Sequence, residues 1–356
     1  MTTTTRPVDQ DRLMAFVGQV IGEFGAVVNA PLVVVGDQLG LYRAMADGVP
    51  VTPAELAQKT GTAQRYVREW LSCQAAGGYL AYEGDDRFSL PAEQAVALTD
   101  ESSPACVLGG FQSFTSASRI LPRLVEAFRS GEGIGWGEHD PGLFAGTARF
   151  FRPGYLAGLT DAWIPSLEGM ADRLAAGGRV ADIGCGFGHS TTILGHAYPQ
   201  ALVTGFDAHQ PSIDAARKLT AEAGVAERVD FQVATAADFP GTGYDLITYF
   251  DCLHDMGDPV GALRHAREAL ADDGTVMLVE PYAADDLADN LTPLGRVFYG
   301  ASTMICTPAS LSEDVGTALG AQAGEQRLGE VARAAGFSRF RRASETPFNL
   351  VLEIRP

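Results

Sequence analysis

The spacing of apolar and polar positions predicts a chain that begins with helices. Apolar residues near the start recur at helical spacing and predict a helix with one apolar stripe. These residues are Leu13, Phe16, Val17, Val20, Ile21 and Phe24. A second helical stretch, "NAPLVVVGDQLGLYRAMADG", is expected to break at Pro31 and to close at Gly48.

The next stretch has the element order of a winged helix. Thr52 followed by Glu55 predicts the capped start of a short helix, Gly61 predicts a turn, and residues 65–75 predict a longer helix. Two short strand-like runs, "YLAY" and "RFSL", are joined by "EGDD", which predicts a hairpin. Residues 101–176 are then mostly helical in pattern, and their many aromatic residues favour packing roles.

From Gly177 onward, aliphatic strand runs alternate with helical spacing. The runs are "RVADIGCG", "ALVTGFD", "RVDFQVA", "YDLITYF" and "TVMLVEP". Such alternation predicts a parallel sheet with crossover helices, and the end of the chain predicts two further strands without a helix between them. The long segment between Pro281 and Arg327 lies at the carboxyl edge of this sheet, where it is well placed to form a lid.

A glycine-rich turn follows the first of these strands. In "VADIGCGFGHST", Gly184, Gly186 and Gly188 allow a ligand to approach the backbone, and a helix N-terminus follows. The spacing differs from the G-x-G-x-x-G of dinucleotide sites. Asp207 ends the next strand, where a carboxylate can accept hydrogen bonds from both hydroxyls of a ribose. Together the loop and Asp207 favour a nucleoside-binding site over a purely structural turn.

The stretch "YFDCLHDMGDP" supplies the candidate for proton transfer. His254 follows a strand at the carboxyl edge of the sheet, and its ordinary pKa of about 6.5 suits a general base. Glu280, at the end of the neighbouring strand, could fix the tautomer of the ring. Asp255 is expected to diverge from its neighbour and to serve as a turn residue. Two other interpretations remain open, namely a capping histidine and a metal site in which His139 and Asp140 join His254 and Asp255.

Composition narrows the class of protein. A length of 356 residues with 46% hydrophobic and 20% charged residues predicts a globular protein of two domains. The formal charge of −18 disfavours binding to nucleic acid or anionic lipid. Five dispersed cysteines predict reduced thiols and a cytoplasmic location. The longest aliphatic run near the start, "PLVVVG", falls short of the roughly 20 residues of a membrane span.

The ordered set of motifs resembles the class I S-adenosylmethionine-dependent methyltransferases. It consists of "DIGCGFG", "GFDAHQPSI", "VATAADFPGTGYDLITYFDCLHDM" and "LADDGTVMLVEP", over about half the chain. This resemblance implies a Rossmann-like seven-stranded α/β domain that binds S-adenosyl-L-methionine. Among the residues it implies, Asp182, Gly184 and Gly186 hold the methionyl end and Asp207 holds the ribose. The full set of implied cofactor-binding residues is Asp182, Gly184, Cys185, Gly186, Asp207, Ala208, Thr235, Ala236, Asp238, Phe239, Asp251 and Tyr155.

With its winged-helix start, the whole chain is similar to the caffeate-type small-molecule O-methyltransferases and related bacterial enzymes. "CLHDMGDP" aligns with their "LHDW-x-D" stretch, which implies that His254 deprotonates the acceptor hydroxyl and that the N-terminal domain dimerises. Met256 replaces the usual tryptophan, and Thr235 stands where an acidic residue is frequent. The expected domains are a winged-helix domain (1–100), a helical connector and substrate cap (101–176) and a methyltransferase domain (177–356).

Two other functions stay open beside methyl transfer. One is a DNA-binding regulator that senses a small molecule, and the other is a cofactor-binding protein that transfers no methyl group. Residues 1–100 carry seven Lys or Arg and twelve Asp or Glu, a net charge of −5. Because a DNA-reading wing needs a basic face, this balance favours a homodimer over a DNA complex. The expected partner is a small-molecule substrate, without nucleic acid, membrane or metal.

Overall fold

The computed structural model describes residues 7–356, which divide into two compact units with their boundary between Thr115 and Ser116. The first unit is mainly helical, and the second is built on a sheet of seven strands. The three-part division expected from the sequence remains a prediction, since the structure draws one boundary.

The first unit is built from helices and a small hairpin. Its elements are α1 (Gln10–Gln38), η1 (Arg43–Met45), α2 (Pro53–Thr60), α3 (Gln64–Ala76), β1 (Ala81–Gly84), β2 (Arg87–Ser89), α4 (Ala92–Thr99) and α5 (Leu108–Ala117), the last of which crosses the boundary. The hydroxyl of Tyr42 donates to Oε1 of Gln74 over 2.7 Å, and Nε2 of Gln74 donates to Oδ1 of Asn29 over 2.6 Å. This buried chain of hydrogen bonds joins the last third of α1 to α3.

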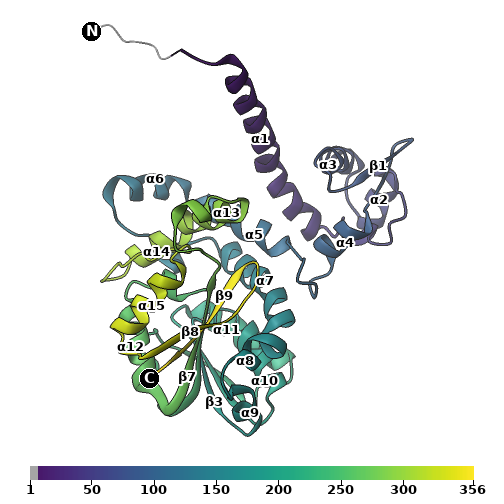
Figure 1. The fold of residues 1–356 in the computed structure, drawn as a ribbon. Coiled ribbons are helices and arrows are strands. Elements are labelled where there is room, and N and C mark those ends of the chain that lie inside the picture. The colour runs from purple at the N-terminus through teal and green to yellow at the C-terminus, as the bar shows by residue number, and fades with distance from the viewer. Residues whose placement is uncertain (1–6) are drawn as a thin grey trace. The chain divides into compact units, whose positions relative to one another are not determined.

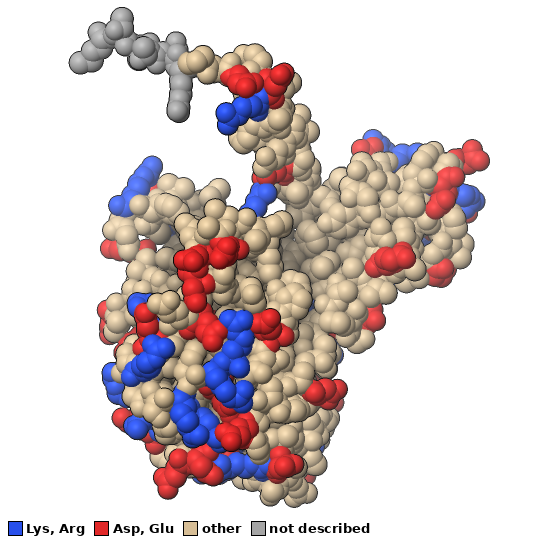
Figure 2. All heavy atoms as spheres, viewed as in Figure 1, with Lys and Arg blue, Asp and Glu red and all other residues tan. Residues whose placement is uncertain are grey.

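Helix α1 corrects the expected break at Pro31 and the expected end at Gly48, since one helix runs to Gln38. It continues past Pro31 because a proline removes one backbone hydrogen bond and the turns on either side keep theirs. Many of its large apolar side chains lie at the surface. Phe16, Ile21, Phe24, Val27 and Val28 are each more than half exposed. Most of the visible surface of this helix is uncharged (Figure 2).

By length and composition, α1 could cross a membrane. The expectation from the sequence counted unbroken aliphatic runs, and therefore missed a window in which glycine, alanine and phenylalanine complete the apolar stretch. Only 11% of that 18-residue window is buried inside the structure. The first unit thus leaves most of this apolar window uncovered.

The predicted helix-turn-helix and wing are confirmed. Thr52 and Glu55 form a capping box at the start of α2, and Gly61 ends that helix in the left-handed conformation. Strands β1 and β2 pair antiparallel, and Asp85 and Asp86 in their turn both have positive φ. The guanidinium of Arg68 on α3 donates to Asp86 over 2.7 Å, so this wing is tied to the helix beside it.

The second unit has a sheet in the strand order β5-β4-β3-β6-β7-β9-β8. Its strands are β3 (Arg179–Ile183), β4 (Leu202–Asp207), β5 (Val229–Val233), β6 (Tyr244–Phe250), β7 (Leu270–Pro281), β8 (Arg339–Glu345) and β9 (Asn349–Arg355). The first five are parallel, as predicted, whereas β9 runs antiparallel to both of its neighbours. The order reverses at β3, so the loops after β3 and β6 leave the same edge side by side.

Helices cover both faces of this sheet (Figure 1). On one face, α7 (Pro141–Gly158), η4 (Leu159–Trp163), α8 (Ile164–Ser166), α9 (Met170–Ala175), α10 (His189–Ala197) and α11 (Gln210–Glu222) contribute to one buried cluster. On the other, α12 (Pro259–Ala269) and α15 (Gly324–Ala334) contribute to a second. Burial on both faces explains why these strands read as continuous aliphatic runs.

Two further segments lie toward the carboxyl edge. One consists of η2 (Ser118–Ile120), α6 (Leu121–Ser130) and η3 (Trp136–Glu138); the other of η6 (Leu287–Asn290), α13 (Pro293–Ala301), η7 (Ser302–Cys306) and α14 (Thr307–Leu311). The predicted lid segment is fastened to the loop after β6. The Ser310 hydroxyl donates to the Met256 carbonyl over 2.8 Å, and the Gly257 N–H donates to Glu313 over 2.7 Å.

Candidate functional site

The three glycines after β3 have different physical roles. All three have positive φ, which only glycine adopts without strain. A Cβ on Gly188 would lie 2.6 Å from the ring of Phe231, and a Cβ on Gly184 would lie 2.8 Å from Sγ of Cys252. Nothing lies within 4 Å of a Cβ built on Gly186. Gly184 and Gly188 therefore allow close packing, whereas the backbone at Gly186 is open to a ligand.

Asp207 lies at the end of β4 and closes this loop. Its Oδ2 accepts from the N–H of Gly186 over 2.9 Å, and its Oδ1 accepts from the N–H of His209 over 2.8 Å. Burial raises the pKa of this carboxyl. Since each carboxylate oxygen has a further lone pair, the carboxylate could still accept hydrogen bonds from two hydroxyls. Ala208, the next residue, is exposed.

Asp182 is a structural centre of the loop. Its carboxylate is fully buried and accepts from the hydroxyls of Ser190, Thr191 and Thr248. Burial raises the pKa of Asp182, and these three hydrogen bonds oppose the rise. The carboxylate thus fixes the start of α10 against β6. A direct contact with the methionyl end of the cofactor stays a prediction.

Asp251, directly after β6, combines backbone strain with an unpaired oxygen. Its φ is +50°, which is uncommon for a residue other than glycine and clusters at functional sites. Oδ1 accepts from Nδ2 of Asn349 over 2.7 Å, whereas Oδ2 is buried without a hydrogen-bond partner. Burial, and then the charge of Glu280, raise the pKa of Asp251. A positively charged amino group would satisfy this oxygen.

The remaining predicted cofactor residues divide between this loop region and the core. Tyr155 is buried with its ring centroid 5.2 Å from that of Phe250, and its raised pKa reflects burial first and then the charge of Asp251. Cys185 is buried inside the glycine loop. An open backbone at Gly186, the carboxylate of Asp207 and the unpaired oxygen of Asp251 together fit the backbone, ribose and amino contacts of S-adenosylmethionine.

The loop Thr235–Phe239 follows β5. Oδ1 of Asp238 accepts from both the N–H and the hydroxyl of Thr235, over 2.8 and 2.7 Å, and these bonds lower the pKa of Asp238. Ala236 is partly buried. The ring of Phe239 belongs to the core, with its centroid 5.4 Å from that of Phe206 and 4.5 Å from that of His265. Adenine recognition by this loop stays a prediction, and the side chains of Asp238 and Phe239 are already engaged.

His254 is held in place as the sequence predicted. It lies in the short helix η5 (Leu253–Asp255), and its Nδ1 contacts Oε2 of Glu280 on β7. The other oxygen of Glu280 accepts from the N–H of Leu253 over 3.0 Å. Both side chains are at least 96% buried. Glu280 therefore fixes the orientation of the ring and leaves Nε2 to face the other way.

Asp255 differs from expectation. Its Oδ1 lies 3.1 Å from Nε2 of His254, so the two neighbouring side chains converge. The reasoning from diverging neighbours was wrong because η5 is a single tight turn in which Cys252 to Met256 change direction sharply. Burial by itself lowers the pKa of His254, but Asp255 and Glu280 outweigh it and raise the pKa well above 6.5.

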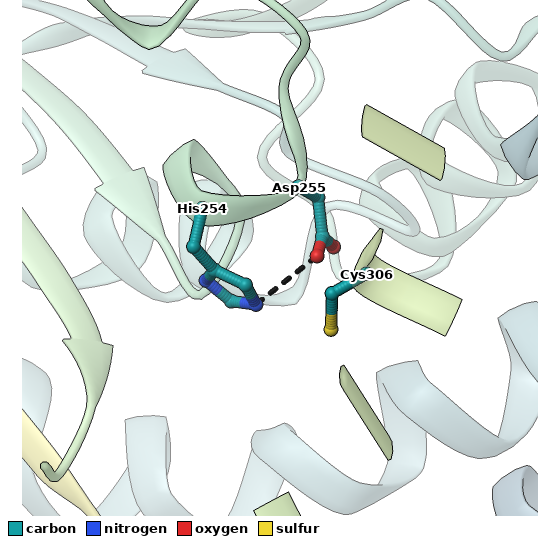
Figure 3. A group of neighbouring side chains, drawn as sticks. All are labelled: His254, Asp255 and Cys306. Atoms are coloured by element: carbon teal, nitrogen blue, oxygen red, sulfur yellow. Dashed lines mark ion pairs between the residues drawn. The ribbon is translucent and has the colours of Figure 1, made fainter. Parts of the chain in front are cut away.

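Cys306 completes the surroundings of the ring (Figure 3). It ends the π-helix η7, a form that is frequent at functional sites. Ligand atoms of His254, Asp255 and Cys306 all lie within 4.8 Å of one another, so these residues could approach a metal ion. Burial raises the pKa of the Cys306 thiol to about 12. Since a metal binds the thiolate, this shift opposes binding. His139 and Asp140 do not belong to this group.

Sequence reasoning missed Asn349, which reaches Asp251 from β9. The two residues are separated by a long stretch of chain, and Asn349 has no motif of its own. Asp255 was considered from the sequence, but its contact with Nε2 of His254 was not predicted. Cys306 lies in the predicted lid segment, and its position beside His254 follows from η7.

Comparisons with known proteins agree with this geometry. Residues 174–336 match the family described as "Methyltransferase domain", and residues 28–100 match the "Rv2258c-like winged HTH domain". An uncharacterised methyltransferase of Bacillus subtilis, YcgJ, is 37% identical over 110 residues, which cover 30% of this chain and 42% of that protein. The chain spans less than half the length of the curated relatives it matches.

Solved structures match nearly the whole chain at low identity. The mitomycin 7-O-methyltransferase MmcR has a TM-score of 0.70 at 21% identity and covers 98% of this chain and 100% of its own. NcsB1, an O-methyltransferase from neocarzinostatin biosynthesis, has a TM-score of 0.58 at 21% identity. The match covers 92% of this chain and 95% of the NcsB1 chain. The NcsB1 structure contains S-adenosyl-L-homocysteine and 1,4-dihydroxy-2-naphthoic acid.

The fold and the site define a protein with a class I S-adenosylmethionine-dependent methyltransferase domain. A winged helix-turn-helix domain precedes it, and S-adenosylmethionine is the cofactor that the methyltransferase domain implies. Both assignments agree with the resemblance found in the sequence.

Proposed function

We propose that the protein transfers the methyl group of S-adenosylmethionine to a hydroxyl oxygen of a small molecule, with His254 as the general base. The observation that carries this proposal is the buried His254–Glu280 pair, with the partly exposed carboxylate of Asp255 at Nε2 and the strained Asp251 two residues before η5. The cofactor, when bound, supplies an activated methyl group. The protein therefore needs to bind and orient both molecules and to remove one proton.

Each polar side chain has a defined task in this proposal. Asp207 binds the ribose of the cofactor, the backbone at Gly186 binds its methionyl end, and Asp251 binds its amino group. Glu280 keeps the proton of His254 on Nδ1, because its carboxylate can only accept there. Nε2 then accepts the proton of the acceptor hydroxyl. Asp255 stabilises the imidazolium that forms.

The proposal is tested by incubating the protein with S-adenosylmethionine and a panel of phenols, alcohols, amines and enols. We expect S-adenosylhomocysteine and an O-methylated product from a hydroxyl acceptor, identified by mass spectrometry. Cofactor binding by calorimetry without product from any acceptor would instead favour a cofactor-binding protein that transfers no methyl group.

The pH dependence of kcat/KM should reflect the charges of Asp255 and Glu280 beside His254. Because they raise the pKa of His254, the free base becomes more abundant as pH rises above neutrality, and kcat/KM should rise with it. Asp255→Asn removes one of the two charges and should move this rise to lower pH. Profiles of kcat/KM against pH measure the shift, with Asp286→Asn on an exposed residue as control. An unshifted rise would show that His254 is not the titrating base.

The alternative of a DNA-binding regulator is less well supported. Arg68, on the helix that would enter a groove, pairs with Asp86 of the wing, and Arg65 pairs with Glu69. Both arginines therefore already have acidic partners within the first unit. A DNA-reading surface needs free cations along one face, and this unit carries a net negative charge. A tight, sequence-selective gel shift at low salt would overturn this preference.

We propose further that the protein is a homodimer joined through α1. A second copy of the helix is the occupant that fits, because the exposed side chains are apolar and a like surface would cover them without unpaired charge. A Cβ on Gly18, Gly22 or Gly25 would meet nothing within 4 Å, so these glycines leave room for another helix to approach closely. The dispersed free cysteines support a reducing, cytoplasmic location.

Charge placed on α1 should separate the copies. We expect the double variant Phe16→Glu, Phe24→Glu to change a dimer into a monomer, because two buried carboxylates in the interface would lose their hydration. Light scattering coupled to size-exclusion chromatography measures the mass. The control Tyr66→Glu changes an exposed aromatic on α3. A wild-type monomer that floats with lipid vesicles would instead favour a membrane as the partner of α1.

A further inference from the structure

His139 is a buried histidine whose ring has no hydrogen-bond partner. It lies between η3 and α7 with 5% of its surface exposed, and both Nδ1 and Nε2 are buried and unpaired. Buried polar groups in folded proteins are almost always satisfied, because an unpaired one has lost its hydration without compensation. The proposed transfer of a proton to His254 gives no role to this ring.

The segment that carries His139 lies across the site. At one end, the N–H of Ile134 donates to the carbonyl of Pro308 over 2.9 Å, two residues after Cys306. At the other end, the ring of Phe144 lies with its centroid 4.5 Å from that of His209. His209 is the residue whose N–H binds Asp207. The segment therefore reaches from the surroundings of His254 to the ribose-binding carboxylate.

A lowered pKa keeps the ring of His139 neutral, and a neutral imidazole suits hydrogen bonding to a ligand rather than pairing with a charge. Burial lowers the pKa of His139, the positive charge of Arg123 lowers it further, and Glu138 and Asp255 oppose this shift. Asp255, which contacts Nε2 of His254, is thus among the charges that act on this ring. A neutral imidazole offers one N–H donor and one nitrogen acceptor.

The neighbouring side chains are flat and apolar. The centroid of Trp136 lies 6.3 Å from that of His139 and 5.3 Å from that of Phe144. Trp136 and Phe144 also belong to the cluster that contains Cys306 and Phe298. Aromatic walls with a few convergent polar groups are typical of sites that bind planar ring systems.

From this arrangement we infer that His139 binds a second oxygen of an aromatic acceptor, a hydroxyl or carbonyl group next to the hydroxyl that is methylated. The inference rests on the proposed function and narrows its substrate class to aromatic hydroxyl compounds with two neighbouring oxygens. His139 is in this role a positioning residue. It turns the acceptor so that the reacting hydroxyl faces Nε2 of His254.

The test compares matched acceptors in wild type and in His139→Phe. The pairs are phenol with catechol and 2-naphthol with 2,3-dihydroxynaphthalene. Binding is measured by calorimetry with S-adenosylhomocysteine present, and turnover is measured separately with S-adenosylmethionine. We expect wild type to prefer the two-oxygen member of a pair by about 10-fold, and His139→Phe to lose this preference through a higher KM with kcat nearly unchanged.

Two controls separate recognition from folding. Because phenylalanine removes unpaired buried atoms, the Tm of His139→Phe should stay equal or rise, and cofactor affinity should not change. His139→Asn, which can donate and accept, should restore part of the preference. The same change at an exposed histidine, His196→Phe, should have no effect on the preference.

The outcomes distinguish this inference from the function on which it rests. Preferential binding of the two-oxygen members without any turnover would support the role of His139 and contradict methyl transfer to these acceptors. Turnover with equal affinity for both members of each pair would overturn the role of His139 and leave the proposed function intact. Absence of binding by every acceptor, or a preference retained in His139→Phe, would also overturn it.

Discussion

His254→Ala should lower turnover by about 100-fold or more, the usual effect of removing a general base. The buried carboxylate of Glu280 fixes Nδ1 of His254, and Nε2 of the same ring faces the opposite way. Cofactor affinity should change little, since Asp207 is held by the N–H groups of Gly186 and His209 rather than by the ring. Single-turnover rates and calorimetric titration with S-adenosylhomocysteine measure the two quantities.

A second variant guards against loss of the fold. In His254→Ala the buried carboxylate of Glu280 loses a partner, which can destabilise the protein by several kcal/mol. His254→Gln keeps an N–H donor for Glu280 but accepts protons poorly, so it should fold normally and still be slow. Turnover near the wild-type rate in His254→Gln with an intact thermal transition would contradict the role of the base.

Asp207→Ala should weaken cofactor binding as its first effect, whereas His254→Ala should lower turnover and leave cofactor binding nearly unchanged. The carboxylate holds the N–H groups of Gly186 and His209, so its loss removes two charge-assisted hydrogen bonds as well as the proposed contacts to the ribose. At about 1.5–3 kcal/mol for such a bond, affinity should fall by roughly 10- to 100-fold. Calorimetric titration with S-adenosylmethionine measures the change.

The matched control changes an exposed aspartate near the same strand end. Asp214→Ala on α11 removes a carboxylate that is 63% exposed and contacts Gln210 and Arg217 of its own helix, so cofactor affinity should not change. With saturating cofactor, Asp207→Ala should recover much of its turnover, because His254 is untouched. Unchanged affinity in Asp207→Ala would remove the ribose role and require another acceptor at the end of β4.

Much of the fold was accessible from the sequence because its signals are local. Aliphatic runs predicted each parallel strand of the second unit, and Thr52 with Glu55 predicted the start of α2. The break at Pro31 failed because one lost hydrogen bond does not end a helix whose other turns are intact. The exposure of α1 could not be predicted either, since an apolar stripe has the same periodicity whether the chain itself or a partner covers it.

The candidate site likewise contains residues that the sequence could predict and contacts that depend on the tertiary structure. The glycine loop, Asp207, His254 and Glu280 were predictable because parallel strands bring their carboxyl ends to one edge. Asp251 was placed in the site by resemblance, but its strain and unpaired oxygen depend on a backbone conformation that its residue type does not favour. Asp255 was misjudged because side-chain direction in a single turn depends on backbone angles that spacing does not encode.

The sequence by itself determined the strands, the winged-helix order and the cofactor class, and it singled out His254 as the candidate base. These depend on periodicity, on capping and on motifs in which the interacting residues are close in the chain or lie at strand ends. Only the tertiary structure decided what surrounds that histidine, with Asp255 at Nε2 and Cys306 beside it, and that the ring of His139 is buried without a partner. Burial and pairing arise when distant segments pack together, and they set both the raised pKa of His254 and the unpaired state of His139.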